Sequence, residues 1–237
     1  MSNRVVAFLP CRRGSQRVPK KNIKPSAGMP FGLVQIKLDQ LLRCSALHSV
    51  VLSTNDEEII EYARSLGNER LVIHLRDDAL SGSETSTDDL VGHALDLIPT
   101  GHILWTHVTS PFITAAHYDD VIKVYFKSLG EGSDSLMTTT RLQAFLWKDG
   151  KALNYSRDSE KWPRTQTIKP LHEINSGVFL ASSEIYRNVN DRIGHRPYLY
   201  EMDKLTSYDI DWAEDFVVAE CLLEKGLVAL FSAGVTA

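Results

Sequence analysis

The chain has 237 residues, of which 43% are hydrophobic and 24% are charged. This ordinary composition excludes collagen-like, coiled-coil and intrinsically disordered proteins, and no apolar run approaches the ~20 residues that span a bilayer. The three cysteines have no C-x-x-C spacing, which argues against a disulfide framework and a zinc ribbon. Together with the lack of a signal-peptide-like segment, they predict a cytoplasmic protein built as one α/β domain.

Basic residues are concentrated at the start of the chain. The net charge is only −4, but the first acidic residue is Asp39, and the residues before it carry eight basic side chains. The remainder holds 18 basic and 30 acidic residues. A chain that is acidic overall is not expected to be a general nucleic-acid binder. Its cationic end predicts a site for an anionic ligand.

The first half of the sequence alternates short apolar segments with amphipathic ones. A buried strand is predicted at Val5–Leu9, followed by a loop rich in Gly, Ser, Pro and basic residues that runs to about Pro30. Acidic residues in the first turn, and Gly67 after the last, delimit a helix at Asp56–Leu66. Further helices are predicted at Leu33–Leu42, Ser86–Leu97 and Ala115–Leu129, and further strands at Val50–Ser53, Leu71–His74 and Ile103–His107. This alternation is typical of β-α-β units around a mostly parallel sheet.

The pattern changes after Ser135. The predicted elements are short strands at Leu136–Thr140, Ala144–Lys148, Lys151–Leu153, Glu173–Leu180 and Pro197–Tyr200, an exposed loop at Asn154–Pro170, and a closing helix at Trp212–Lys225. Asp149-Gly150 is a favourable hairpin turn. The chain is therefore predicted to form a three-layer, Rossmann-like α/β core with a mostly parallel sheet and a β-rich excursion at about residues 135–172.

One candidate site is the basic loop, residues 10–22, which directly follows the first predicted strand. Open α/β sheets bind ligands at the carboxyl ends of their strands. Gly14 permits close approach of the backbone, Ser15 adds a hydroxyl donor, and Arg12 and Lys21 can neutralise phosphates. The loop has neither a G-x-x-x-x-G-K-[ST] nor a G-x-G-x-x-G motif, so a solvated basic loop is the alternative.

A second candidate site is formed by Asp209 and Asp211. In an extended segment, residues two apart face the same side, so the two carboxylates would lie together. Paired carboxylate oxygens near phosphates suit Mg²⁺. The alternative is structural, because Asp211 and Glu214 are spaced as the N-cap and third residue of the closing helix. Both can hold, since a capping aspartate can still offer an oxygen outward.

The basic loop resembles the A-R-x-G-S-x-x-x-P-x-K-N nucleotide-binding loop of the cytidylyltransferases that activate sialic acids. The matching residues are Arg12, Gly14, Ser15, Pro19, Lys21 and Asn22, with Cys11 at the position of the usual alanine. In that family the loop wraps the triphosphate of CTP. The segment from Asp209 to Asp215 resembles the D-I-D-x-x-x-D metal-binding signature of the same family.

Three further segments resemble the family in order along the chain. Residues 51–56 match a V-x-S-T-D-D strand end, with Asn55 in place of an aspartate. Residues 108–111 correspond to a Q-P-T-S-P turn, and residues 175–179 stand where N-G-A-I-Y is usual. The resemblance extends from residue 4 to about residue 225, which is nearly the whole chain.

This resemblance implies a single cytidylyltransferase domain over residues 1–237, with a nucleotidyltransferase fold similar to glycosyltransferase-A. It implies transfer of CMP from CTP to the anomeric hydroxyl of a nonulosonic acid, with release of pyrophosphate and with Mg²⁺ as cofactor. The catalytic residues would be Arg12, Lys21, Asp209 and Asp211, with both aspartates on the metal. The CTP site would comprise Arg12, Gly14, Ser15, Lys21, Asn22 and Thr87.

The resemblance also implies contacts with the sugar and with a second chain. His107, Ser110 and Asn175 stand at positions that face the sugar acid in the family. The family is usually homodimeric, with the β-rich excursion exchanged across the interface. Arg164 resembles a family arginine that reaches the substrate from the partner, so we expect a homodimer.

Departures from the family pattern cluster where the family contacts the sugar. His107 replaces the usual glutamine, Ile113 replaces the arginine of T-S-P-L-R, and Ser176 interrupts the usual N-G pair. Isoleucine removes a charge and five donors, and an apolar side chain suits a deoxy or methyl-bearing group. We therefore expect a legionaminic- or pseudaminic-type acid rather than N-acetylneuraminate, the alternative being that Arg141 or Arg157 restores the charge.

Two other functions fit parts of the pattern. A non-catalytic nucleotide- or anion-binding protein on the same fold would keep the basic loop and release no pyrophosphate from CTP. An RNA-binding loop is disfavoured because no aromatic residues are interleaved between Arg12 and Lys24.

Overall fold

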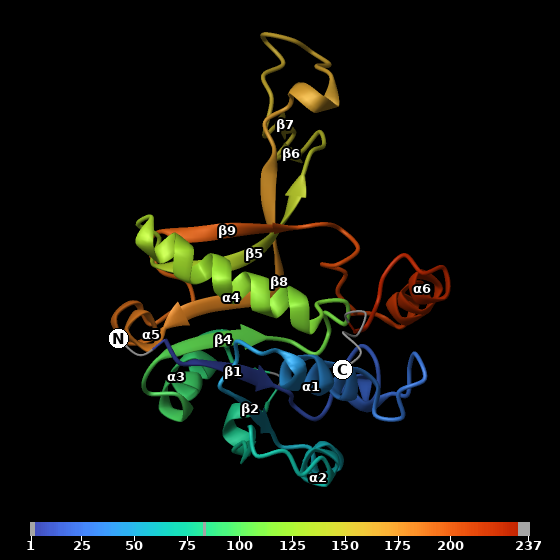
Figure 1. The fold of residues 1–237 in the computed structure, drawn as a ribbon. Coiled ribbons are helices and arrows are strands. Elements are labelled where there is room, and N and C mark those ends of the chain that lie inside the picture. Colours follow the sequence, from blue (N-terminus) through green and yellow to red (C-terminus); the bar gives the residue numbers. More distant parts are fainter. Residues whose placement is uncertain (1–2, 83, 232–237) are drawn as a thin grey trace.

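A seven-stranded sheet forms the centre of the molecule in the computed structural model, which describes residues 3–82 and 84–231. Its order is β3-β2-β1-β4-β8-β5-β9 (Figure 1). The strands are β1 Val5–Pro10, β2 Ser49–Thr54, β3 Leu71–Leu75, β4 His102–Thr106, β5 Ser135–Leu142, β8 Leu171–Ser182 and β9 Pro197–Met202. β8 runs antiparallel to both neighbours, and the other pairs are parallel. The predicted mostly parallel sheet is therefore confirmed.

Helices cover both faces of this sheet, which gives the predicted three layers. They are α1 Gly32–Arg43, α2 Glu57–Ser65, α3 Thr87–Leu97, α4 Ala115–Gly130, α5 Ser183–Val189 and α6 Ala213–Glu224. Side chains alternate along β1: Val5, Ala7 and Leu9 belong to the core shared with α1, α2 and α4, whereas Val6 and Phe8 belong to the core shared with α3 and α5. Among the described residues, no helix has both the length and the apolarity to cross a membrane.

The sheet topology creates a crevice beside the first strand. β1 lies between β2 and β4 and is parallel to both. The loop that follows the carboxyl end of β1 therefore lies on one side of the crevice, and the segment that follows β4 lies on the other side. Ligands of open α/β sheets bind at such a switch point. The basic loop follows β1, and the turn at residues 107–111 follows β4, so the fold brings these two sequence motifs to one place.

A bulge separates the sheet from a projecting arm. The register of β5 against β8 shifts between Met137 and Thr139, and Ser176 opposite this shift has a left-handed φ of 56°. Beyond it, residues 143–170 extend away from the body and carry β6 (Trp147–Lys148) and β7 (Lys151–Ala152) (Figure 1). The projecting part is thus shorter than the excursion predicted at 135–172, because β5 and β8 belong largely to the central sheet.

Two helices differ from expectation. α5 was not predicted, since it spans only seven residues; Ser182 caps it by accepting a hydrogen bond from Ile185 N at 3.3 Å. α6 begins after Trp212, and Asp215 accepts the amides of Asp211 and Trp212 at 2.8 and 2.7 Å. The interpretation of Asp211 and Glu214 as a capping pair is therefore wrong, because Asp215 reaches back to the helix start and leaves the Asp211 carboxylate to other partners.

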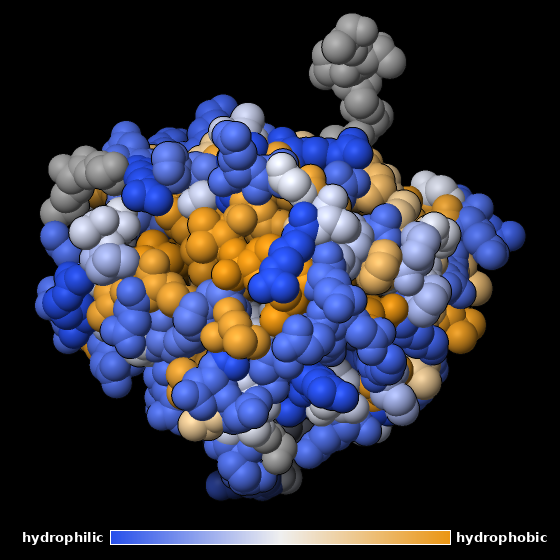
Figure 2. All heavy atoms as spheres, turned by 90° about the horizontal axis from the view of Figure 1, so that it is seen from below, coloured by the Kyte–Doolittle hydropathy of each residue, from blue (hydrophilic) through white to orange (hydrophobic). Residues whose placement is uncertain are grey.

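β3 forms one edge of the sheet and exposes apolar side chains. Val72 and Leu75 are 50% and 63% exposed, and β2 is the strand that pairs with β3 among the described residues. Figure 2 shows this end of the molecule, where apolar residues gather into a patch bordered by polar ones. Two residues of β3, His74 and Leu75, also line a neighbouring pocket.

Candidate active site

The basic loop lines a pocket of about 300 Å³ together with the turn after β4. Arg12, Ser15, Lys21 and Asn22 all border this pocket, so the structure brings together the side chains that the sequence singled out. Asn22 donates to the Arg12 carbonyl at 3.1 Å, which folds the loop back on itself. The Arg12 guanidinium has no hydrogen-bond or ion-pair partner among the described residues. It is therefore available to an anion in the pocket.

Gly14 shapes the outer part of the basic loop. Its φ is +80°, a conformation that favours glycine, and a Cβ placed there would have no heavy atom within 4 Å. The residue is needed for its backbone conformation and leaves open space beside the chain. A ligand can approach this backbone closely, as the sequence predicted.

Asp211 is tied to the basic loop by two cations. Arg17 Nη1 lies 2.6 Å from Asp211 Oδ2, and Lys21 Nζ lies 3.2 Å from Oδ1 and 2.9 Å from the carbonyl of Ile210. The Arg17 guanidinium also lies 5.0 Å from the ring centroid of Trp212. Partial burial works in the opposite direction, but the hydrogen bonds from Arg17 and Lys21 hold the pKa of Asp211 below its usual value. The carboxylate is ionised at neutral pH.

Asp209 lies deeper than Asp211. Ser110 Oγ is 3.4 Å from its Oδ1, and the Ile210 amide donates to the Thr109 carbonyl at 2.9 Å, so the segment is fastened to the turn after β4. Burial, and then the nearby charge of Asp211, raise the pKa of Asp209. Both aspartates border one pocket with Asn175 and Ser176. A cation there would relieve the repulsion between them.

The donor set fits Mg²⁺ rather than a transition metal. Mg²⁺ is held by one or two protein carboxylates together with waters and substrate phosphates, and Asp209 and Asp211 supply such a pair beside a pocket lined by phosphate-binding residue types. Among the described residues, no group of three or more His, Cys, Asp or Glu side chains is arranged to hold a metal ion. Two carboxylates would leave the other coordination positions of Mg²⁺ to waters and substrate phosphates.

A buried lysine supports the turn after β4. Lys37 on α1 is fully buried, and its Nζ donates to the Ser110 carbonyl and to the Tyr118 hydroxyl, each at 2.8 Å. The chain of hydrogen bonds continues from Tyr118 through Thr106 Oγ1 to the Gly177 carbonyl. Burial lowers the pKa of Lys37 to about 7. Ser110 is itself fully buried behind Asp209, so it supports the carboxylate and does not line the site as a sugar contact, contrary to expectation.

His107 borders two of the pockets, with both ring nitrogens engaged. Trp105 Nε1 donates to its Nε2 at 3.0 Å, so Nδ1 carries the proton and donates to the Ser176 carbonyl at 2.9 Å. Desolvation lowers the pKa of His107 to about 4. A neutral ring with no spare donor is therefore presented to the site.

Protonation of His107 should make the protein easier to unfold in acid. The unfolded chain takes up this proton near pH 6.5, but the fold resists it until about pH 4, so the stability that depends on neutral His107 is complete above pH 6.5 and is lost between these values. The full effect is on the order of 3 kcal/mol. Urea unfolding at pH 7 and pH 4.5 should show that the free energy of unfolding falls less between these pH values in His107→Gln than in wild type. The control is His48→Gln on the surface, and equal losses in all three proteins would contradict the assignment.

The bulge in β8 carries Asn175, a predicted sugar contact, and Ser176, where the chain departs from the family pattern. Asn175 Oδ1 accepts from Thr138 Oγ1 at 2.6 Å and from the Gly177 amide at 3.1 Å, and its Nδ2 donates to Thr140 Oγ1 at 3.2 Å. Most of its hydrogen-bonding capacity is thus used within the protein. Asn175 and Ser176 still line the pocket beside the two aspartates, so their contact with a sugar stays a prediction.

Ile113 does not line the site. Its side chain is fully buried in the core, and its Cδ1 would lie only 2.6 Å from a Cβ added at Gly177. The expectation that Ile113 offers an apolar surface to the sugar is therefore wrong. The segment after the turn points this side chain inward, which the sequence pattern alone did not reveal.

Arg76 is a site residue that the sequence analysis missed. It follows β3, is 3% exposed, and its Nε and Nη2 have no partner among the described residues. It borders a pocket of about 400 Å³ with Thr87 and Arg12, and a larger one of about 910 Å³ on its other side. Its place at the carboxyl end of a strand is the signal that could have found it.

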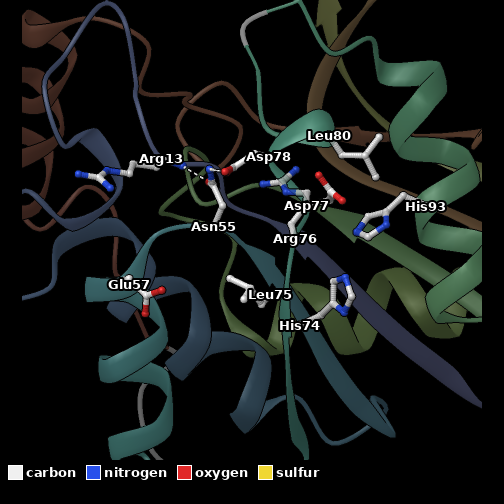
Figure 3. A pocket seen from close by; sticks show the side chains of 10 residues that line it. All are labelled: Arg13, Asn55, Glu57, His74, Leu75, Arg76, Asp77, Asp78, Leu80 and His93. Atoms are coloured by element: carbon white, nitrogen blue, oxygen red, sulfur yellow. Dashed lines mark hydrogen bonds between the residues drawn. The ribbon is translucent and has the colours of Figure 1, made fainter.

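Figure 3 shows the larger pocket, where the Arg76 side chain lies between those of Asp77 and Asp78. Asn55 connects its walls: its Oδ1 accepts the Arg13 amide at 2.9 Å, and its Nδ2 donates to Asp78 at 3.2 Å. Asn55 thus joins the basic loop to the segment after β3, which accounts for an amide at a position where the family pattern has an acid. Thr87 begins α3, capped by Ser86, as predicted.

Three arginines of the second half lie in different places. Arg164 is exposed on the arm at the start of a short 3-10 helix. Arg141 donates to Gln143, and Arg157 lies over the rings of Trp147 and Trp162 on the arm. None of the three lines a pocket with His107 or Asp209 in the part of the chain that is described. Arg141 and Arg157 therefore do not restore the positive charge at the sugar side of the site. Arg192, from the loop after α5, lines the pocket that contains His107 and Asp209.

Known proteins share both the sequence and the fold of this chain. It is 24% identical over 224 residues to the pseudaminic acid cytidylyltransferase of Campylobacter jejuni subsp. jejuni serotype O:2, covering 92% of this chain and 95% of that protein. It is 25% identical over 232 residues to the N-acylneuraminate cytidylyltransferase of Escherichia coli O18:K1:H7, covering 95% of this chain and 53% of that protein. This chain thus spans about half of the second relative.

Solved structures share the architecture at lower identity. A CMP:2-keto-3-deoxy-manno-octonic acid synthetase complexed with CTP superposes with a TM-score of 0.67 at 15% identity, covering 94% of this chain and 99% of the other. The 4-diphosphocytidyl-2C-methyl-D-erythritol synthase of Anaerococcus prevotii gives 0.63 at 14% identity, covering 93% and 96%. These likenesses establish the fold. The sequence profile described as Cytidylyltransferase matches residues 6–234, and the chain therefore belongs to the cytidylyltransferase family.

Proposed function

We propose that this protein transfers CMP from CTP to the anomeric hydroxyl of a nonulosonic acid and releases pyrophosphate. The observation that carries the proposal is the meeting of the basic loop with Asp209 and Asp211 at the switch point of the sheet. Cations suited to a triphosphate and carboxylates suited to a hard metal ion border the same pockets, and Lys21 contacts Asp211 directly. The named relatives act on sugar acids of this class.

In the proposed reaction the anomeric oxygen forms a bond to the α-phosphorus, and the bond from that phosphorus to the bridging oxygen breaks. Pyrophosphate carries away the electron pair, and the proton of the anomeric hydroxyl passes to solvent. Such transfers depend mainly on positioning and on neutralising charge. Arg12 would bind the phosphates, and Lys21 would hold them while keeping its contact with Asp211. Ser15 and the open backbone at Gly14 would add hydrogen bonds.

The base would lie toward Arg76 and Thr87. Cytosine presents a carbonyl and a ring nitrogen as acceptors, and the unpartnered Nε and Nη2 of Arg76 are donors in the same pocket. Asn22, at the root of the basic loop, would face the ribose or base. This arrangement would bind CTP before any sugar arrives.

Asp209 and Asp211 would hold Mg²⁺, which when bound neutralises charge on the α-phosphate and acidifies a nearby hydroxyl. Asp211 would then share its oxygens between the metal and the cations of the basic loop. We also propose a cytoplasmic homodimer in which Arg164, exposed on the arm, reaches the site of the partner chain.

The sugar would be a relative of N-acetylneuraminate with different substituents. The family pattern has a glutamine at position 107, whose amide offers donors, whereas both nitrogens of His107 are engaged. A polar substituent that meets this ring finds no partner, so a deoxy or methyl-bearing substituent is favoured. The preference thus depends on His107 and not on Ile113, whose side chain is buried in the core.

One assay tests these proposals in sequence. Pyrophosphate release is measured with CTP, Mg²⁺ and a panel that includes N-acetylneuraminate and di-N-acetylated 9-deoxy nonulosonates. Turnover with any sugar acid supports the transferase, whereas CTP binding without turnover on any of them favours a non-catalytic nucleotide-binding protein. If kcat/KM for N-acetylneuraminate is at least tenfold higher than for the 9-deoxy nonulosonates, about 1.4 kcal/mol, the proposal of a different sugar is refuted. The proposal that the protein is a transferase is then unaffected.

A further inference from the structure

Arg192 sits on an aromatic floor within the candidate site. It belongs to the loop between α5 and β9, and its guanidinium carbon lies 3.7 Å from the ring centroid of Phe179 and 4.9 Å from that of Trp105. Those rings project from the neighbouring strands β8 and β4, where Trp105 pairs with Phe179. Arg192 borders the pocket of about 400 Å³ that also includes His107, Ser176 and Asp209. Its position is therefore fixed by the sheet itself.

The charge of Arg192 is not neutralised by the protein. Among residues 3–82 and 84–231, no carboxylate oxygen lies within ion-pair distance of it, and no hydrogen bond from its guanidinium is found. The adjacent Asp191 accepts the Ile193 amide at 3.3 Å instead. Desolvation lowers the pKa of Arg192, which is the cost of holding this cation without a partner.

The surroundings favour an oxygen acceptor as the missing partner. A guanidinium over aromatic rings keeps its N–H groups available at its edge, where they can bind two oxygens or one carbonyl. On the same wall, His107 has no spare donor, since its Nδ1 proton is used by Ser176. Arg192 therefore offers, in the same pocket, the N–H donors that His107 lacks.

We propose that Arg192 is a specificity-determining residue that binds a carboxylate or acyl carbonyl of the sugar-acid substrate. The inference rests on the proposed function, because it assigns the sugar to the part of this pocket bordered by His107, Ser176 and Arg192, while the base would occupy the part bordered by Arg76 and Thr87. It also predicts that the sugar, and not CTP, depends on Arg192.

The test compares Arg192→Met, Arg192→Lys and the control Arg187→Met with wild type. Arg187 lies on α5 and donates to the Pro99 carbonyl, away from this pocket. At saturating CTP, Arg192→Met should raise the KM for the sugar acid about 10- to 100-fold, as expected for a charge-assisted hydrogen bond. The KM of Arg192→Lys for the sugar acid should lie between those of wild type and Arg192→Met, because lysine keeps the charge and loses the planar guanidinium. The KM for CTP and the melting temperature should change little.

Substrate analogues identify the group that is bound. With the C1 carboxamide of the best sugar acid, which loses the charge and keeps one carbonyl, the effect of Arg192→Met should shrink if the carboxylate is the partner; with the N-deacylated analogue it should vanish if the acyl carbonyl is. Two outcomes would overturn the inference when the wild type is active. One is a sugar KM that Arg192→Met leaves unchanged, and the other is an increase in KM that is equal for all three sugars. A wild type that turns over no sugar acid would instead overturn the proposed function, and this inference with it.

Discussion

Asp209→Asn is expected to reduce pyrophosphate release from CTP by roughly 10²-fold or more, the loss seen when a group that stabilises developing charge is removed. Asparagine keeps the shape of the side chain and its contact with Ser110, but it lacks the charge that would hold Mg²⁺. Asp211→Asn should have a comparable effect, because it also releases Arg17 and Lys21 from their ion pairs. Steady-state turnover with saturating CTP and Mg²⁺ measures both.

The matched control is Glu214→Gln, an exposed acid in the first turn of α6. It should retain full turnover, since it lies outside the pockets of the site. Because Asp215 and not Asp211 caps α6, the Asp211 variant should melt close to the wild-type temperature. A folded Asp209→Asn protein with undiminished turnover would sink the metal assignment.

Arg12→Ala should weaken CTP binding by about 1.5–3 kcal/mol, the range for a hydrogen bond to a charged group. Its guanidinium borders both the pocket of the basic loop and the pocket that contains Arg76 and Thr87. It also has no partner in the described part of the chain that would compete with phosphate. Titration calorimetry with CTP in the absence of sugar measures the change.

Lys20→Ala is the control for this experiment. Lys20 belongs to the same loop but pairs with Glu58 at the surface and borders none of these pockets. The Lys20→Ala variant tests whether the overall positive charge of the loop is enough to bind CTP. Its CTP affinity should stay within a few-fold of wild type. If Arg12→Ala and Lys20→Ala weakened binding equally, the contribution would be long-range attraction and not a contact with phosphate.

The central sheet could be predicted from the sequence because its strands are apolar runs between helices with clear ends. In β1 every residue but the last is buried, and Asp56 caps α2 at the predicted start. The bulge at Ser176 and the short helix α5 could not be predicted in the same way. A left-handed residue inside a strand has no periodic signal, and seven residues are too few for one.

The site was predictable where its residues are adjacent in sequence. The basic loop and the Asp209–Asp211 pair each form a compact motif, and they meet because the Ile210 amide is bonded to the Thr109 carbonyl and Lys21 pairs with Asp211. Arg76 and Arg192 escaped notice because each is a single residue whose role depends on distant partners. Ile113 was misplaced for the same reason, since only the packed core shows which way its side chain points.

The apolar edge at β3 bears on how this protein behaves in concentrated solution. The outer backbone groups of an edge strand can pair with a strand from another molecule, and charged side chains normally oppose such pairing. Val72 and Leu75 offer no such opposition. Association at this edge would continue the sheet without disturbing the crevice between β1 and β4, so an aggregating sample could retain intact substrate sites. Solubility is therefore separable from activity in this fold, and Val72→Lys would improve the former at a position remote from the chemistry.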